Sequence, residues 1–219
     1  MHTKDDPQDC KKIKYSAEEL IDLASSKGFQ VMSITNHNKI TYSPYLREYA
    51  KHRGILLIPG TEVTVEGRHI LLINYLGEIG FRKISDLWKV KRLDTLILAA
   101  HPFFPGKTTL KDKLVENIDL FDGIEFCHFY RPWVNFNTRA IQVSKQFQKP
   151  LVGTSDVHFL PQLNHTYSMV ETQTKTAAGI AQAIKKGQLK IVSQPVPLST
   201  LFHVLHKFGW GIFRTLFFG

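Results

Sequence analysis

Short apolar runs alternate along the chain with segments whose apolar residues recur at helical spacing. Residues 16–27 read SAEELIDLASSK, in which Ser16 and Glu19 form a capping box and Gly28 can end the helix. The next segment, FQVMSIT at 29–35, is a short apolar run typical of a buried strand. The chain therefore begins its pattern with a helix followed by a strand.

The same alternation continues to about residue 192. Further strands are expected at 55–59, 69–76, 94–102, 121–127, 150–156 and 165–171, and further helices at 44–54, 110–118, 133–148 and 176–187. Buried strands that alternate with helices indicate parallel βαβ units. Because no Gly-x-Gly-x-x-Gly follows a strand, a β/α barrel is a better prediction than an open doubly wound sheet.

Composition narrows the class of protein. The 219 residues are 43% apolar, which suits one domain with a sizeable core. The formal net charge of +9 favours anionic partners such as phosphate esters, nucleic acid or acidic lipid. Two cysteines are too few for a disulfide framework, and there is no apolar leader and no long apolar run. We therefore expect a cytoplasmic protein.

Metal-binding side chains follow several of the predicted strands. They are His37, Glu62, His101, Glu125, Asp156 and His158. In a β/α barrel the C-terminal ends of the strands share one face, so these groups should converge. Imidazole together with carboxylate suits Zn, Mn or Fe, and a site with two such ions can activate water for phosphoryl transfer. The pattern predicts a metal-dependent phosphoesterase.

The order and spacing of seven short motifs resemble those of the PHP (polymerase and histidinol phosphatase) family, particularly its stand-alone phosphoesterases. The motifs are HT at 2–3, ITNHN at 34–38, PGTEVT at 59–64, GRHILL at 67–72, AAHPF at 99–103, GIEF at 123–126 and GTSDVH at 153–158. The resemblance implies a distorted β/α barrel, TIM-like and of the seven-stranded type. It would form a metallo-phosphoesterase domain over residues 1–195.

The resemblance also implies two or three divalent ions, Mn, Zn or Fe. The first ion would be held by His2, Glu62 and Asp156. Glu62 would bridge to a second ion, which His69 and His101 would also bind.

A third ion would be held by His37 and His158 with a carboxylate from the first loop. Asp9 is the expected carboxylate and Asp6 is its rival, because the loop spacing differs from the usual one. A metal-activated water would attack phosphorus, and the catalytic set would be His101, Asp156, His158 and Glu62.

Basic and aromatic side chains at the rim would bind the ester. Arg131 and Arg139 are the expected contacts, with Arg68 and Lys107 as rivals. His128 stands where the family often has Asn, so it would touch the substrate or fill the rim.

Two positions depart from the family pattern. The family's first motif is His-x-His after a strand, whereas Met1 here takes the middle position, so the first His and the first barrel strand are missing. We expect that the natural chain starts further upstream; the alternative is a protein that lacks one ligand and one strand, which would leave strand edges exposed. Asn36 stands where the family usually has Asp and supplies no negative charge.

The C-terminal tail, residues 196–219, is apolar and basic and ends FRTLFFG. It would be a helix that covers the barrel, an interfacial helix on anionic lipid or a docking helix for a partner. Gly209 and Gly211 weaken any continuous helix there.

The expected function is hydrolysis of a phosphomonoester, a nucleotide or the end of an oligonucleotide. The main alternative is a degenerate PHP domain that binds a phosphorylated ligand or partner without turnover. An amidohydrolase-type hydrolase ranks third, since the sequence does not show the carboxylated-lysine arrangement of that chemistry. A nucleic-acid-binding module ranks last, because the aromatic residues fall on predicted core faces. The sequence leaves the oligomeric state open.

Overall fold

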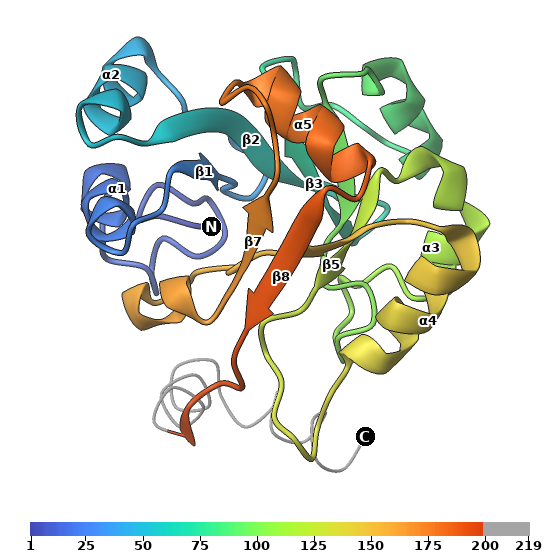
Figure 1. Ribbon diagram of the computed structural model, residues 1–219. Coiled ribbons are helices and arrows are strands. Elements are labelled where there is room, and N and C mark those ends of the chain that lie inside the picture. The colour runs from blue at the N-terminus through green and yellow to red at the C-terminus, as the bar shows by residue number, and fades with distance from the viewer. Residues whose placement is uncertain (199–219) are drawn as a thin grey trace.

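The computed structural model describes residues 1–198, which form a mixed α/β fold around one curled sheet (Figure 1). The sheet contains six strands that follow one another in chain order. They are β1 (Val31–Ile34), β2 (Leu56–Val65), β3 (Arg68–Ile73), β4 (Leu96–Ala99), β5 (Gly123–Phe126) and β6 (Leu151–Gly153). A separate antiparallel pair of strands, β7 (Thr166–Val170) with β8 (Leu189–Ser193), lies beside β6.

Helices cover the sheet from several sides (Figure 1). Within the described residues they are α1 (Ala17–Ser26), α2 (Pro44–His52), α3 (Asp112–Glu116), α4 (Asn137–Phe147) and α5 (Ala177–Lys185), with 3-10 turns η1 (Ile84–Val90), η2 (Ile118–Leu120) and η3 (Leu160–Asn164). The predicted capping box is confirmed, because the Ser16 hydroxyl accepts from Glu19 N–H and the Glu19 carboxylate accepts from Ser16 N–H.

The strand directions differ in part from the prediction of parallel units. β1–β2, β4–β5 and β5–β6 are parallel as expected, but β3 runs antiparallel to both β2 and β4. The cause is the turn at Glu66 and Gly67, which have φ of 49° and 70°. A two-residue turn with positive φ joins antiparallel strands, whereas a parallel pair needs a long crossover.

The sheet curls into half of a barrel. Among residues 1–198 no hydrogen-bonded ladder joins β6 back to β1, so the closed barrel of seven strands is not seen. β8 was not predicted, and β2 continues six residues beyond the expected end at Pro59. The coarser prediction, a mixed α/β fold with strand ends gathered at one mouth, is confirmed.

The central strands are buried on both faces. Ile97 and Ala99 of β4 pack into the core beneath α3 and α4, whereas Leu96 and Leu98 face the concave side. α5 covers this concave side through Ile180 and Ile184. Burial on both faces explains why these strands read as unbroken apolar runs.

The concave side encloses a cavity of about 740 Å³, lined largely by apolar side chains. Glu62, Glu125 and Asp156 lie in its wall and mark the end at which the polar residues gather.

No helix within residues 1–198 is long and apolar enough to cross a membrane. Most of the tail expected at 196–219 lies outside the described residues, from 199 onward.

Candidate metal centre

The first three residues join the loops that follow β1 and β6. The Met1 carbonyl accepts from Thr35 N–H at 2.8 Å, and His2 N–H donates to the Val157 carbonyl at 3.0 Å. Thr3 N–H donates to the Asn36 side-chain oxygen at 2.9 Å. These backbone contacts fix His2, which is fully buried, between the two loops.

Asp6 orients two of the imidazoles. Its Oδ2 accepts from Nδ1 of His2 at 2.7 Å and from Nδ1 of His37 at 2.9 Å, while Oδ1 accepts from the backbone N–H groups of Gln8 and Asp9. An ionised carboxylate only accepts hydrogen bonds, so both Nδ1 atoms carry the proton. Nε2 of His2 and of His37 therefore faces the cluster, where a cation can take the place of a proton, as in carboxylate–histidine–metal triads.

Glu62 lies at the centre of four imidazoles. Its carboxylate oxygens lie 3.3 Å from His2 Nε2, 4.0 Å from His37 Nε2, 2.7 Å from His69 Nδ1 and 3.4 Å from His101 Nε2. Within the described chain, Oε1 is nevertheless buried and accepts no hydrogen bond. A carboxylate oxygen so close to imidazole nitrogens, without hydrogen bonds, has the surroundings of a ligand that shares a cation with them.

A second group of ligands forms around Asp156. Its Oδ1 lies 3.2 Å from His2 Nε2 and 3.6 Å from His158 Nδ1. His158 Nδ1 donates to the Asp156 carbonyl at 3.0 Å, which leaves Nε2 directed at Asp9, 3.4 Å away. Asp9 also lies 3.9 Å from His37 Nδ1, so it connects His158 with His37.

Three triads in this cluster bring one ligand atom of each member within 4.8 Å of the others: His2, Asp156 and His158; His2, Asp6 and His37; and His37, Glu62 and His69. Because the triads share His2 and His37, they form one continuous cluster. The residues present therefore fit a centre of more than one divalent ion.

Two site residues adopt a backbone conformation that side chains rarely take. His101 has φ of 25° and Asp156 has φ of 38°. Such conformations cost of order 1–3 kcal/mol each and concentrate at functional sites.

Charges in the cluster are strongly coupled. Burial by itself would raise the pKa of Glu62, but the imidazoles of His101, His2 and His69 hold it well below its usual range. Burial would lower the pKa of His2, but the hydrogen bonds that its ring donates to the carboxylates of Asp156, Asp6 and Glu62 raise it to about 10. The pKa of His101 is raised to about 9, since Glu62 outweighs burial. The carboxylates of the cluster are thus stabilised by nearby positive charge, which protons on the imidazoles or metal ions can supply.

All eight ligands expected from the sequence belong to this cluster. They are His2, Asp9, His37, Glu62, His69, His101, Asp156 and His158. The two carboxylates proposed as rivals take different positions: Asp6 lies behind the imidazoles, whereas Asp9 faces His158.

The sequence predicts Glu125 among the side chains that converge at the strand ends, but we assigned it to none of the expected ions. The structure buries its carboxylate, which accepts from His101 N–H and from the Thr154 hydroxyl. Burial raises the pKa of Glu125 to about 7, and the negative charge of Asp156 adds to the effect. Glu125 therefore fixes the backbone of His101 and adds a carboxyl group beside the buried Glu62 and the partly buried Asp156.

Asn36 fixes the first loop. Its amide nitrogen donates to the hydroxyls of Thr3 at 2.9 Å and Thr41 at 2.7 Å, and its oxygen accepts from Thr3 N–H. An amide makes these contacts without adding negative charge to the cluster. Its role in the described structure is to hold the residue that follows His2.

The expected substrate contacts lie further out. Arg139 pairs with Asp112 at 2.8 Å at the surface, and its guanidinium lies 5.3 Å from the ring centroid of Phe103. Arg131 donates to the Val196 carbonyl and stacks on Trp133, with 4.4 Å between the guanidinium carbon and the ring centroid.

The remaining candidates for substrate contacts differ in how exposed they are. Arg68 donates to the Lys107 carbonyl at the surface, and Lys107 is exposed. His128 is buried, and burial lowers its pKa to about 4. His128 is therefore neutral at neutral pH and can give or accept a hydrogen bond.

The sequence of this chain matches a family model and a known relative. Residues 134–189 match the family model described as PHP-associated. The chain is 32% identical over 143 residues to the uncharacterized protein MJ1587 of Methanocaldococcus jannaschii, covering 62% of this chain and 82% of that protein.

Two solved structures share the fold. One is a two-domain protein from Bacteroides vulgatus described as containing a predicted PHP-like metal-dependent phosphoesterase, with a TM-score of 0.69 and 21% identity. The match covers 89% of this chain and 63% of that protein, so this chain spans less than two thirds of it. The other is PsfC from Pseudomonas syringae, with a TM-score of 0.60, 14% identity and coverage of 87% and 88%.

Proposed function

Since the chain belongs to the PHP family, we propose that it is a metal-dependent phosphoesterase that hydrolyses a phosphate ester at the cluster around Glu62. The observation that carries the proposal is Glu62 itself. It is a buried carboxylate surrounded by the imidazoles of His2, His37, His69 and His101, and its Oε1 accepts no hydrogen bond from the described residues.

The donor set supports divalent ions that accept both nitrogen and oxygen, such as Mn, Zn or Fe. We propose that Glu62 would help to hold two of them, one together with His2 and Asp156 and the other together with His69 and His101. His37, His158 and Asp9 would form the third group of ligands. When bound, such ions supply Lewis acidity and a water that ionises near neutral pH.

The protein's own residues do the positioning. Asp6 keeps the protons on Nδ1 of His2 and His37, so that Nε2 of each faces the cluster. Glu125 holds the backbone of His101. His128, which is buried and neutral, can donate a hydrogen bond to an ester oxygen.

Basic groups around the mouth favour an anionic substrate. We propose Arg131 and Arg139 as contacts to the ester, with Arg68 and Lys107 as further candidates, and a formal charge of +9 supports this. A phosphomonoester, a nucleotide or the end of an oligonucleotide remains the proposed substrate class, with nucleic acid as a possible substrate. The closed barrel expected from the sequence stays a prediction, since the described strands form a curled half-barrel.

The second candidate function is binding of a phosphorylated ligand without turnover. Asn36 favours it, because an amide stands where the family usually has a carboxylate and it bonds only to Thr3 and Thr41 among the described residues.

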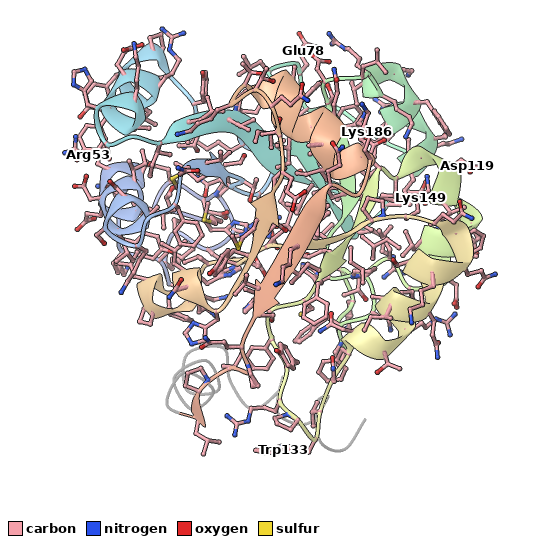
Figure 2. The ribbon with its side chains drawn as sticks, viewed as in Figure 1. Arg53, Glu78, Asp119, Trp133, Lys149 and Lys186 are labelled. Atoms are coloured by element: carbon pink, nitrogen blue, oxygen red, sulfur yellow. The ribbon has the colours of Figure 1, made fainter. Side chains whose placement is uncertain are left out.

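Phosphate release from a panel of phosphomonoesters and nucleotides, with added Mn, tests the proposal. Activity in the wild type that is lost in Asp156→Asn supports a catalytic metal centre. Asp119→Asn is the matched control, since Asp119 is exposed at the edge of the molecule, far from the cluster (Figure 2). Release that is equal in all three proteins contradicts the proposal, and binding of Mn without any release favours the second candidate.

A further inference from the structure

Aromatic rings gather in the loops that follow β4 and β5. Phe104 comes from the first loop, and Phe129 and Phe136 come from the second. The centroid of Phe104 lies 5.9 Å from that of Phe129 and 5.5 Å from that of Phe136, with interplanar angles of 87° and 79°. We call these three residues the aromatic rim.

The aromatic rim is continuous with the metal-ligand cluster. The Phe104 ring lies 6.4 Å from that of His101, a ligand at the end of β4. The Phe129 ring lies 6.2 Å from that of His128, the buried neutral imidazole. The aromatic rim therefore lies next to the metal-ligand cluster on the side of His101 and His128.

Core packing does not account for these rings. Phe103, their neighbour in the chain, packs against the main hydrophobic core, but Phe104, Phe129 and Phe136 do not belong to the core clusters of the described residues. Each of the three is only partly buried. Partly exposed aromatic rings beside a small set of convergent polar groups are typical of a ligand pocket.

Positive charge lies beside the rim. The Arg139 guanidinium lies over Phe103, and Lys107 is exposed in the same loop as Phe104. The aromatic rim is therefore an apolar surface that lies next to Arg139, Lys107 and the metal-ligand cluster. This combination suits a molecule that has an anionic part and a flat aromatic part.

We propose that the aromatic rim binds the base of a nucleoside monophosphate, or of a terminal nucleotide, whose phosphate lies at the metal-ligand cluster. The proposal rests on the phosphoesterase function above and narrows its substrate class. Stacking of a base on aromatic side chains tolerates any base, because every base has a π-face. The rim thus selects for the presence of a base rather than for its identity.

The test compares two phosphomonoesters that differ only in the base, adenosine 5′-monophosphate and ribose 5-phosphate. Binding in the presence of Mn is measured by calorimetry, and turnover by phosphate release. The proteins are the wild type, Phe104→Ala, Phe129→Ala and Phe129→Trp, which keeps a stacking ring. Trp88→Ala is the control, because Trp88 is an exposed aromatic residue on η1, outside the rim.

The wild type should bind the nucleotide about 5- to 150-fold more tightly than the sugar phosphate, the effect of stacking one base. Phe104→Ala and Phe129→Ala should lose most of this preference and keep their affinity for the sugar phosphate, whereas Phe129→Trp and Trp88→Ala should retain it. Equal affinities in the wild type, or a preference that both alanine variants keep, would overturn the proposal. The wild-type comparison decides even if a variant does not fold.

The two hypotheses fail differently. Base-dependent binding without phosphate release keeps the aromatic rim as a base site and removes the phosphoesterase function. Phosphate release at equal efficiency from both esters keeps the phosphoesterase function and overturns the role of the rim.

Discussion

Nδ1 of His2 lies 2.7 Å from Oδ2 of Asp6, and the same oxygen lies 2.9 Å from Nδ1 of His37. One buried carboxylate thus fixes the tautomer of two imidazoles. Burial alone would raise the pKa of Asp6, but the hydrogen bonds from His2 and His37 hold it far below its usual range. Asp6 is therefore ionised at neutral pH and acts as a hydrogen-bond acceptor behind the candidate ligands.

Replacing Asp6 by Asn should weaken metal binding about 10- to 100-fold, as expected for loss of a carboxylate behind metal-binding histidines. The amide cannot accept from both imidazoles and both neighbouring backbone groups as the carboxylate does. Titration of the metal-free protein with Mn in a calorimeter measures the change. Asp5→Asn is the matched control, because Asp5 is the exposed neighbour of Asp6. An unchanged affinity in Asp6→Asn would contradict this role.

Bound metal should stabilise the fold strongly. Without it, the carboxylates of the buried Glu62 and the partly buried Asp156 repel each other and depend on protonated imidazoles. A ligand at about 100 times its Kd adds about 2.7 kcal/mol to the free energy of unfolding. For a chain of this size that raises Tm by about 5–10 °C. Thermal unfolding in EDTA and in Mn measures the shift, and identical Tm values in the two buffers would count against a metal centre.

His128 should make stability depend on pH. Burial lowers the pKa of His128 to about 4. The nearby His158, His101 and His165 also lower it, whereas the negative charge of Asp156 raises it. The unfolded chain binds a proton between pH 6.5 and 4 where the folded chain does not. This contribution is therefore complete above pH 6.5 and is lost as the pH falls toward 4.

The expected loss from His128 is about 2 kcal/mol between pH 7.5 and pH 5. Urea unfolding of wild type and His128→Gln in EDTA at the two pH values isolates it, because the remaining groups are common to both proteins. The wild type should lose more stability than the variant on acidification. Parallel pH profiles would show that His128 is not buried in its neutral form.

The start of α1 offers a test of the fold that leaves the site untouched. Ser16→Ala removes the side chain that accepts from Glu19 N–H and should cost about 1 kcal/mol in the free energy of unfolding. Ser26→Ala, at the exposed end of the same helix, should change stability by less than about 0.5 kcal/mol. Chemical denaturation measures both, and equal effects would argue against the capping box.

Local signals explain which elements could be predicted. The capping box and Gly28 mark α1 without reference to the rest of the chain, and apolar runs mark β1 and β4 because they are buried. The direction of β3 depends on two φ angles, at Glu66 and Gly67, which a strand pattern does not contain. β8 was missed because LKIVS is only partly buried and becomes a strand by pairing with β7.

In the site, too, some residues could be predicted from local signals and others depend on tertiary contacts. His37, Glu62, His101 and Asp156 could be predicted because they follow apolar runs, and strand ends meet in space. The sequence favoured Asp9 over Asp6 as a ligand, but the position of Asp6 behind the rings of His2 and His37 depends on the turns of the first loop and could not be predicted. The contact of Glu125 with the backbone of His101 joins two strands and leaves no trace in the local sequence.

The most direct test of the metal centre is the number of Mn ions bound at equilibrium by metal-stripped wild type, Glu62→Gln and Glu78→Gln. Glu78 is an exposed control outside the cluster, at the top of the molecule in Figure 2. Wild type and Glu78→Gln should bind two or three ions, and Glu62→Gln should bind fewer and more weakly, because the bridging carboxylate is gone. Binding of the same number of ions, at the same affinity, by Glu62→Gln and wild type would contradict a centre built around Glu62.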